Sequence, residues 1–216
     1  MKSVMVQELS KTRASGYQGK RSRRKHPRNH HDLLSTHTLI TPLSNPPAGK
    51  VMSRILVAYA TKKGSTAEIA QAIAKELQAA GHSADAVEIA QGASPTGYDA
   101  VVIGGPIYLG KIEGMGKFVK RHSTELAKVP VAGFVVCLAA VTKDPEGMAW
   151  AEKALHAALD PLRPVAGAVF AGRLDPENLS WFQRLAVKKA KSPVGDFRDW
   201  TAIAAWAREL PAKMGI

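Results

Sequence analysis

Short continuous apolar runs alternate along the chain with segments in which apolar residues recur every three or four positions. The run at 54–60 predicts a buried strand, and Ile69, Ile73 and Leu77 then mark one face of a helix that Gly81 ends. The same alternation repeats from there to the C-terminus. The expected strands are 54–60, 84–89, 100–105, 131–139 and 165–171; the expected helices are 66–80, a segment after 114–116 that carries Phe118, Val119 and Leu126, 148–159, and one that Asp199 caps and that buries Trp200, Ile203, Ala204, Ala207 and Leu210.

Strands separated by helices predict right-handed crossovers and a parallel sheet that is covered on both faces. The runs at 100–105 and 131–139 are continuously apolar, as doubly covered strands should be. We therefore predict an α/β fold with a doubly wound, five-stranded parallel sheet. In such folds the ligand lies beyond the carboxyl ends of the strands, so the segments that follow the first, third and fourth strands become the candidate site.

The turn after the first strand combines three hydroxyl side chains, two lysines and a glycine. It opens a helix whose first N–H groups and positive dipole end favour an anion. Ser65 and Glu68 also fit a capping box, which is an alternative explanation for these two positions. The turn is neither a Walker loop nor a Gly-x-Gly-x-x-Gly fingerprint. The residues predicted to bind a phosphate group are Thr61, Lys62, Lys63, Gly64, Ser65 and Thr66.

The segments after the third and fourth strands are suited to a flat heterocyclic ring. The first of them places small residues before an apolar and aromatic wall, although Tyr108 could also be an ordinary exposed loop residue. In the second we expect backbone groups to cover the other side of the ring. None of these segments contains an evident general base, so no catalytic residue is assigned. The predicted ring-binding residues are Pro106, Ile107, Tyr108, Leu109, Gly110, Ala139, Ala140, Val141 and Thr142.

The net charge of +12 is unevenly distributed. Residues 1–51 hold 10 Lys/Arg and 2 Asp/Glu, whereas residues 52–216 hold 20 and 16. The first segment has little apolar periodicity and contains four of the seven histidines, for which we predict no metal site. We predict a disordered basic extension over 1–51 and one folded domain over 52–216. The extension could be dispensable, an organelle transit peptide or a nucleic-acid-binding arm; no specific nucleic-acid partner is predicted.

The single cysteine excludes a disulfide framework. Cys137 lies in an apolar run, which favours a buried, inert thiol and a reducing compartment. The chain contains no run of 18 or more apolar residues, so no transmembrane helix is expected. The expected location is the cytoplasm.

The Thr-x-x-Gly-x-Thr turn at 61–66, the Gly-Gly-Pro-Ile-Tyr-Leu-Gly segment at 104–110 and the five-strand alternation resemble the flavodoxin family. This resemblance runs from Met52 to the C-terminus and implies the strand order 2-1-3-4-5 and FMN as cofactor. Within the family, the chain looks most like the menaquinone-dependent protoporphyrinogen IX dehydrogenases of bacterial haem synthesis. The stretches that carry this likeness are 118–122, 171–174, 179–189 and 199–210.

The segment at 179–191 predicts a basic amphipathic helix with Trp181 and Phe182 on its apolar side. Such a helix could lie on an anionic membrane surface, where a quinone would be met. Alternatively, the same apolar side packs on the sheet and the lysines are solvated.

The resemblance implies an FMN-dependent oxidoreductase in which electrons pass from a porphyrinogen-type substrate through the flavin to a quinone. Two redox alternatives remain: an electron-transfer protein with another redox partner, or a quinone reductase without porphyrinogen activity. Electron carriers of this family are usually acidic, and a domain charge of +4 argues against that alternative. A receiver-type signalling domain would need acidic residues at the ends of the first and third strands, where this chain has Thr61 and Gly104, so the sequence argues against that alternative. The sequence does not predict an oligomeric state.

Overall fold

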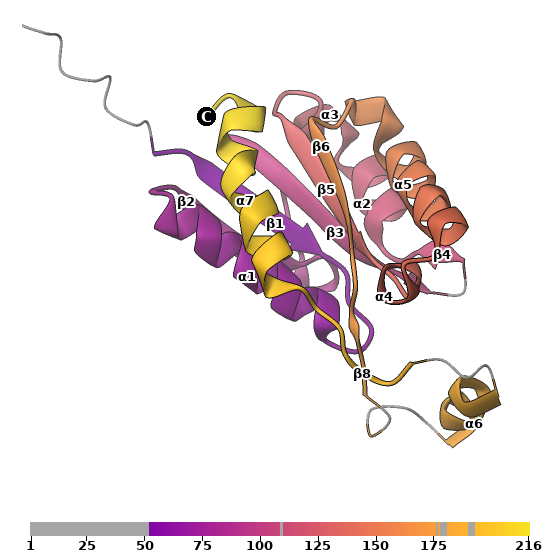
Figure 1. The fold of residues 1–216 in the computed structure, drawn as a ribbon. Coiled ribbons are helices and arrows are strands. Elements are labelled where there is room, and N and C mark those ends of the chain that lie inside the picture. Colours follow the sequence, from indigo (N-terminus) through magenta and orange to yellow (C-terminus); the bar gives the residue numbers. More distant parts are fainter. Residues whose placement is uncertain (1–51, 109, 176, 178–180, 190–192) are drawn as a thin grey trace, which may run out of the picture. The chain divides into compact units, whose positions relative to one another are not determined.

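The computed structural model describes residues 52–108, 110–175, 177, 181–189 and 193–216, which belong to one compact unit (Figure 1). The predicted extension over 1–51 lies outside the described residues. Among the helices of the described residues, none combines the length and hydrophobicity that a membrane span requires.

The described strands form a six-stranded sheet in the order β2-β1-β3-β5-β6, with β4 paired to the end of β3. The five strands of the main path are all parallel, and their order is the predicted 2-1-3-4-5 because β4 is a short additional strand. The predicted fold class is therefore confirmed. The strands are β1 (Arg54–Tyr59), β2 (Ser83–Glu88), β3 (Ala100–Tyr108), β4 (Lys111–Ile112), β5 (Val131–Val136) and β6 (Ala166–Phe170); a separate antiparallel pair is formed by β7 (Arg173–Leu174) and β8 (Gly195–Asp196).

Helices cover both faces of this sheet, as Figure 1 shows. Alternate residues of β1 enter two different cores: Ile55 and Val57 pack with α1 and α7, whereas Leu56 and Ala58 pack with α2 and α5. This alternation explains why the strand reads as a continuous apolar run. The helices are α1 (Ser65–Ala79), α2 (Met115–Arg121), α3 (Ser123–Leu126), α4 (Ala139–Thr142), α5 (Pro145–Leu159), α6 (Trp181–Lys189) and α7 (Trp200–Met214), with 3-10 turns at Ile89–Gln91 and Asp160–Leu162.

Several predicted boundaries were wrong. The helix after 114–116 is interrupted at His122, which separates α2 from α3. Helix α5 begins three residues before the predicted start because Asp144 caps it, accepting a hydrogen bond from the Gly147 N–H (2.9 Å). Asp199 caps α7 as predicted, through the Ala202 N–H at 2.9 Å.

The predicted buried face of α7 is only partly correct. Ile203, Ala207 and Leu210 are buried, but Trp200 is exposed and Ala204 half-buried. The ring of Trp200, the first residue of α7, instead lies against Arg198, whose guanidinium carbon is 4.5 Å from the ring centroid. The aromatic packing of this face comes from Trp206, which lies edge-on to Phe134 and Phe170.

Candidate functional site

The turn after β1 starts α1 in the way that an anion-binding turn requires. Gly64 is the N-cap residue, in the left-handed region at φ 88°. Its N–H donates to Thr61 Oγ1 (3.1 Å), which fixes the turn, and its carbonyl accepts the first helical bond from Glu68 (3.1 Å). The N–H groups of the next three residues are therefore the open first-turn donors of the helix. The side chain of Thr66, in this first turn, is only 1% exposed.

The capping-box alternative for Ser65 and Glu68 was wrong. Ser65 is the first helical residue rather than the cap, because Gly64 adopts the conformation that ends the preceding turn. The Glu68 carboxylate instead binds two arginines from a distant part of the chain, Arg198 and Arg173.

The second predicted segment is a strand and hairpin rather than a loop. The parallel ladder with β5 continues to Pro106, and Ile107 and Tyr108 then pair antiparallel with Ile112 and Lys111. The apolar residues after Pro106 have strong strand propensity, and this pairing overrides the turn signal of Gly104-Gly105-Pro106. Leu109 lies outside the described residues. Gly110, which follows it in the hairpin turn, has a positive φ of 74°.

The first two segments meet at the carboxyl ends of β1 and β3. The Ala60 N–H donates to the Gly104 carbonyl (2.9 Å). Farther out, the Lys62 Nζ lies 3.1 Å from Glu113 Oε1 and 4.6 Å from the centroid of the Tyr108 ring. The phosphate-type turn and the aromatic wall are thus held side by side, which is the arrangement that a ligand with a phosphate and a ring needs.

The third predicted segment adopts a different structure from the one expected. Strand β5 ends at Val136, three residues early, and Ala139–Thr142 form the short helix α4. The Val141 and Thr142 N–H groups donate to the Leu138 carbonyl at 2.8 and 3.2 Å, so these N–H groups are used within the turn. The prediction that the backbone of this segment covers a ring assumed an open loop, and it is wrong for the Val141 and Thr142 N–H groups. Leu138, which was not predicted, presents an apolar side chain that is 46% exposed at the same end of β5.

Cys137 is the last core residue before this helix. It is buried, and burial raises the pKa of its thiol, only partly offset by hydrogen bonding from the backbone of Ala140 and Ala139. A thiol held in its neutral form is a poor nucleophile. The prediction that this cysteine is buried is confirmed, and the raised pKa is consistent with the predicted inert thiol.

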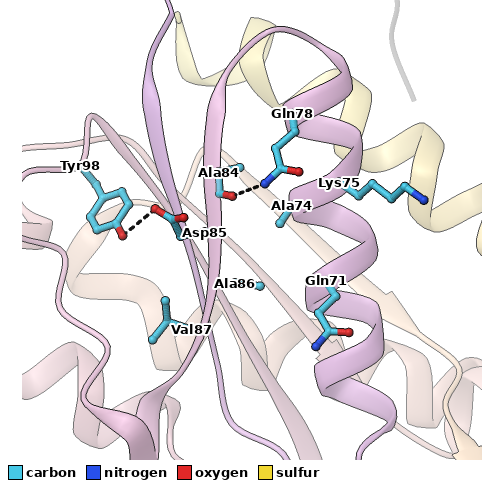
Figure 2. Close-up of a pocket in the computed structure, with 9 residues that line it drawn as sticks. All are labelled: Gln71, Ala74, Lys75, Gln78, Ala84, Asp85, Ala86, Val87 and Tyr98. Atoms are coloured by element: carbon cyan, nitrogen blue, oxygen red, sulfur yellow. Dashed lines mark hydrogen bonds between the residues drawn. The ribbon is translucent and has the colours of Figure 1, made fainter.

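A hollow of about 590 Å³ lies elsewhere, between α1 and the outer edge strand β2 (Figure 2). Its walls include the Tyr98 hydroxyl, which donates to Asp85 (2.9 Å), and the Gln78 amide, which donates to the Ala84 carbonyl (2.6 Å). Among the described residues, none of those predicted to bind the cofactor lines this hollow. We assign the site to the carboxyl ends of the strands because the charged and aromatic groups converge there.

A segment between β6 and α7 leaves the sheet next to the phosphate-type turn. Its neck is the pair β7 and β8, and beyond the neck it carries α6; we call the whole segment, 173–196, the arm. Trp181 is 78% exposed and Leu185 60% exposed, so the alternative in which the apolar side of this helix packs on the sheet is wrong for these two residues. The rest of the predicted helix, at 179–180 and 190–191, lies outside the described residues.

Three charged residues at the site were missed by the sequence analysis: Glu113, Arg173 and Arg198. Each acts through a partner from another element, which spacing along the chain does not reveal. The only signal was for Arg173, which falls in 171–174, a stretch that resembles the family.

Comparison with known proteins identifies the relatives of this chain. Residues 56–200 match the model of the flavodoxin domain. The protoporphyrinogen IX dehydrogenase [quinone] of Escherichia coli strain K12 is 31% identical in an alignment of 172 residues, gaps included, that covers 73% of this chain and 94% of that protein.

Solved structures of flavodoxins are similar at lower identity. A flavodoxin of Streptococcus pneumonia TIGR4 is 15% identical, with a TM-score of 0.48 over 74% of this chain and 99% of the other. Flavodoxin 1 of Bacillus cereus is 12% identical, with a TM-score of 0.47 over 76% and 97%.

Proposed function

Because the chain belongs to the flavodoxin domain family, we propose that it is an FMN-dependent oxidoreductase that oxidises a porphyrinogen and passes the electrons to a quinone. The cofactor is FMN and the role is flavin-dependent redox chemistry. The observation that carries the substrate and the acceptor is the 31% identity with a quinone-linked protoporphyrinogen IX dehydrogenase across 94% of that protein.

The residues at the carboxyl ends of the strands fit FMN. The open start of α1, the Ser65 and Thr66 hydroxyls and Lys63 would hold the phosphate. Gly64 has a left-handed backbone, and a Cβ placed on it would have no atom within 4 Å, so the space beside the turn is open. Thr61 supports this turn by accepting the Gly64 N–H.

The hairpin of β3 and β4 would supply the ring site. Tyr108 offers an aromatic face, and Lys62 holds it beside the phosphate-type turn. Pro106, Ile107 and Gly110 complete this hairpin, with Leu138 and α4 (Ala139, Ala140, Val141, Thr142) as the apolar boundary at the end of β5.

When bound, FMN supplies the group that takes an electron pair and its protons from the substrate and gives them to the quinone, which becomes a quinol. The protein's part is to bind, orient and shield. Ile107, Ile112, Ala139 and Ala140 all pack against the core cluster on the α2 and α5 face, so the apolar boundary of the site is anchored in the core.

The arm supports a contact with the inner face of the membrane, where a lipid-soluble quinone is found. Helix α6 exposes Trp181 and Leu185, and its sequence contains Arg184, Lys188 and Lys189 without an acidic residue. Apolar anchors together with basic side chains are the two features that bind a helix to an anionic lipid surface.

The second candidate function is electron transfer, or quinone reduction, without porphyrinogen oxidation. It is favoured by the family, which includes carriers, and it uses the same FMN site. The net charge of +4 over 52–216 and the exposed apolar arm favour the membrane-linked oxidoreductase instead.

Turnover distinguishes the candidates. The purified full-length chain, loaded with FMN, is given protoporphyrinogen IX and a menaquinone under anaerobic conditions. Formation of the fluorescent porphyrin that depends on both protein and quinone supports the proposal. Reduction of the quinone by a chemical donor, with no porphyrin formed, supports the alternative and refutes the porphyrinogen assignment.

A further inference from the structure

A carboxylate stands where an anion should bind. Glu68 lies in the first turn of α1, three residues after Ser65 and therefore on the same side of the helix. A bare negative charge at this distance would oppose a phosphate at the helix start and cancel part of the helix dipole's attraction.

Two arginines neutralise this carboxylate, one on each of its oxygens. Arg198 Nη1 donates to Glu68 Oε2 at 2.5 Å, and Arg173 Nη2 lies 3.3 Å from Glu68 Oε1. Arg198 is held in place on its other side by Asp196, with Nε 2.8 Å from Oδ1 and Nη2 2.5 Å from Oδ2. The four groups sum to zero charge, so the loss of either arginine leaves a net negative charge beside the turn.

The arginines lie at the neck of the arm, Arg173 as the first residue of β7 and Arg198 two residues after β8, and the chain here passes next to the phosphate-type turn. Gly172 lies so close to Ser65 that a Cβ on the glycine would be 3.3 Å from Ser65 Oγ. The Phe197 N–H donates to the Gly172 carbonyl (3.2 Å), which joins the two sides of the neck. The side chain of Arg198 is only 4% exposed and that of Glu68 is 41% exposed, so solvent screens their interaction only in part.

We propose that Arg173 and Arg198 are positioning residues that cancel the charge of Glu68 and thereby make the start of α1 selective for a phosphate ester, FMN, over the uncharged riboflavin. This inference rests on the proposed function only in taking FMN as the ligand. The arginines act through Glu68 and need not contact the phosphate.

A purely structural clamp between the arm and α1 predicts a different pattern. If the ion pairs only fasten the neck, removal of Glu68 and removal of Arg198 should both loosen the turn and weaken binding. If they cancel charge, Arg198→Gln weakens FMN binding, whereas Glu68→Gln leaves it unchanged or makes it tighter. The double variant Glu68→Gln/Arg198→Gln should then recover most of the loss.

The test measures dissociation constants of FMN and riboflavin by flavin-fluorescence titration of the full-length chain after flavin removal. Arg198→Gln should bind FMN about tenfold more weakly while its riboflavin affinity changes less than about twofold, and added salt should reduce the difference. If Arg198→Gln folds poorly, the same two dissociation constants are measured for Arg173→Gln, whose side chain is more exposed to solvent. The control is Arg208→Gln, which breaks an ion pair between α7 and α1, Arg208 Nε to Glu76 Oε2 at 2.8 Å, away from the turn.

The outcomes separate this inference from the proposed function. A wild-type chain that binds no FMN refutes the proposed function. A wild-type chain that binds FMN, with the two arginine variants keeping the same preference for FMN over riboflavin, overturns this inference alone. Equal losses in Glu68→Gln and Arg198→Gln overturn it in favour of the clamp.

Discussion

The ammonium group of Lys62 lies over the ring of Tyr108, with 4.6 Å between Nζ and the ring centroid. The two residues belong to different segments, the turn after β1 and the hairpin of β3 and β4. The same ammonium group forms an ion pair with Glu113, at the end of the hairpin, with 3.1 Å between Nζ and Oε1. The contact therefore joins the part of the site suited to a phosphate with the part suited to a ring, and it gives the two parts separate tests.

Tyr108→Ala should weaken the binding of FMN and of riboflavin alike, by about tenfold, because an aromatic face contributes equally to the binding of ligands that share one ring system. Tyr108→Phe keeps the face and should bind both flavins within about twofold of the wild type. Fluorescence titration measures both constants. A loss confined to FMN would mean that Tyr108 acts at the phosphate rather than at the ring.

Thr66→Val and Lys63→Ala should have the opposite selectivity. The first removes a buried hydroxyl at nearly constant volume, and the second removes a positive charge. Each variant should therefore bind FMN about tenfold more weakly, as expected for the loss of a charge-assisted hydrogen bond, while its affinity for riboflavin hardly changes. Comparable losses for the two flavins would show that these residues support the fold of the turn and do not touch the phosphate.

The double substitution Trp181→Ser/Leu185→Ser should abolish most binding to anionic vesicles, since it removes two large exposed apolar side chains of α6. Co-sedimentation with vesicles of mixed neutral and anionic phospholipid measures the bound fraction, and purely neutral vesicles should bind less of the wild type. Trp150→Ser is the matched control, because Trp150 is an exposed tryptophan of α5. Equal binding by wild type and double variant would rule out α6 as the contact.

The pH dependence of stability should depend on Asp196. Hydrogen bonding from Arg198 lowers the pKa of this carboxyl from 3.8 to about 2, despite some opposing desolvation. Since the folded-state pKa is the lower one, the stabilisation is fully present above about pH 4 and is lost as the pH falls towards 2. Asp196→Asn should therefore cost about 1 kcal/mol or less at neutral pH, given the solvent screening of this half-exposed group.

Urea unfolding of the wild type and Asp196→Asn at a series of pH values measures this difference. The two free energies of unfolding should converge near pH 2. A difference that stays constant down to that pH would mean that the ionised carboxyl contributes nothing to the effect.

A chain that starts at Met52 should fold and bind FMN as well as the full chain, because the flavodoxin domain match begins at residue 56 and β1 at Arg54. Thermal unfolding and FMN titration of the two forms give the comparison. Lower stability or weaker binding of the shortened chain would assign a structural role to residues 1–51.

The fold was predictable because its strands carry their own signal. Residues such as Leu56 and Ala58 face one core while Ile55 and Val57 face the other, and this leaves a continuous apolar run that only a doubly covered strand explains. Strand ends were less predictable. Tyr108 extends β3 only because Lys111 folds back against it, and that pairing is a tertiary event that local propensity does not encode.

The site was predictable where a single turn holds the chemistry, as at Gly64, and not where partners come from far along the chain. Glu68 and Arg198 are separated by 130 positions, and their contact depends on how the neck of the arm passes α1. Leu138 is apolar and follows a buried strand, so its sequence context predicts burial, yet it is exposed because β5 stops at Val136. Long-range geometry decided both cases.

Titration of the flavin-free, full-length chain with FMN and with riboflavin tests the central claim most directly. The account predicts binding of one FMN per chain, a yellow protein that releases FMN on denaturation, and clearly weaker binding of riboflavin because the open start of α1 then holds no phosphate. A chain that stays colourless and binds neither flavin, or that binds the two equally, would contradict it.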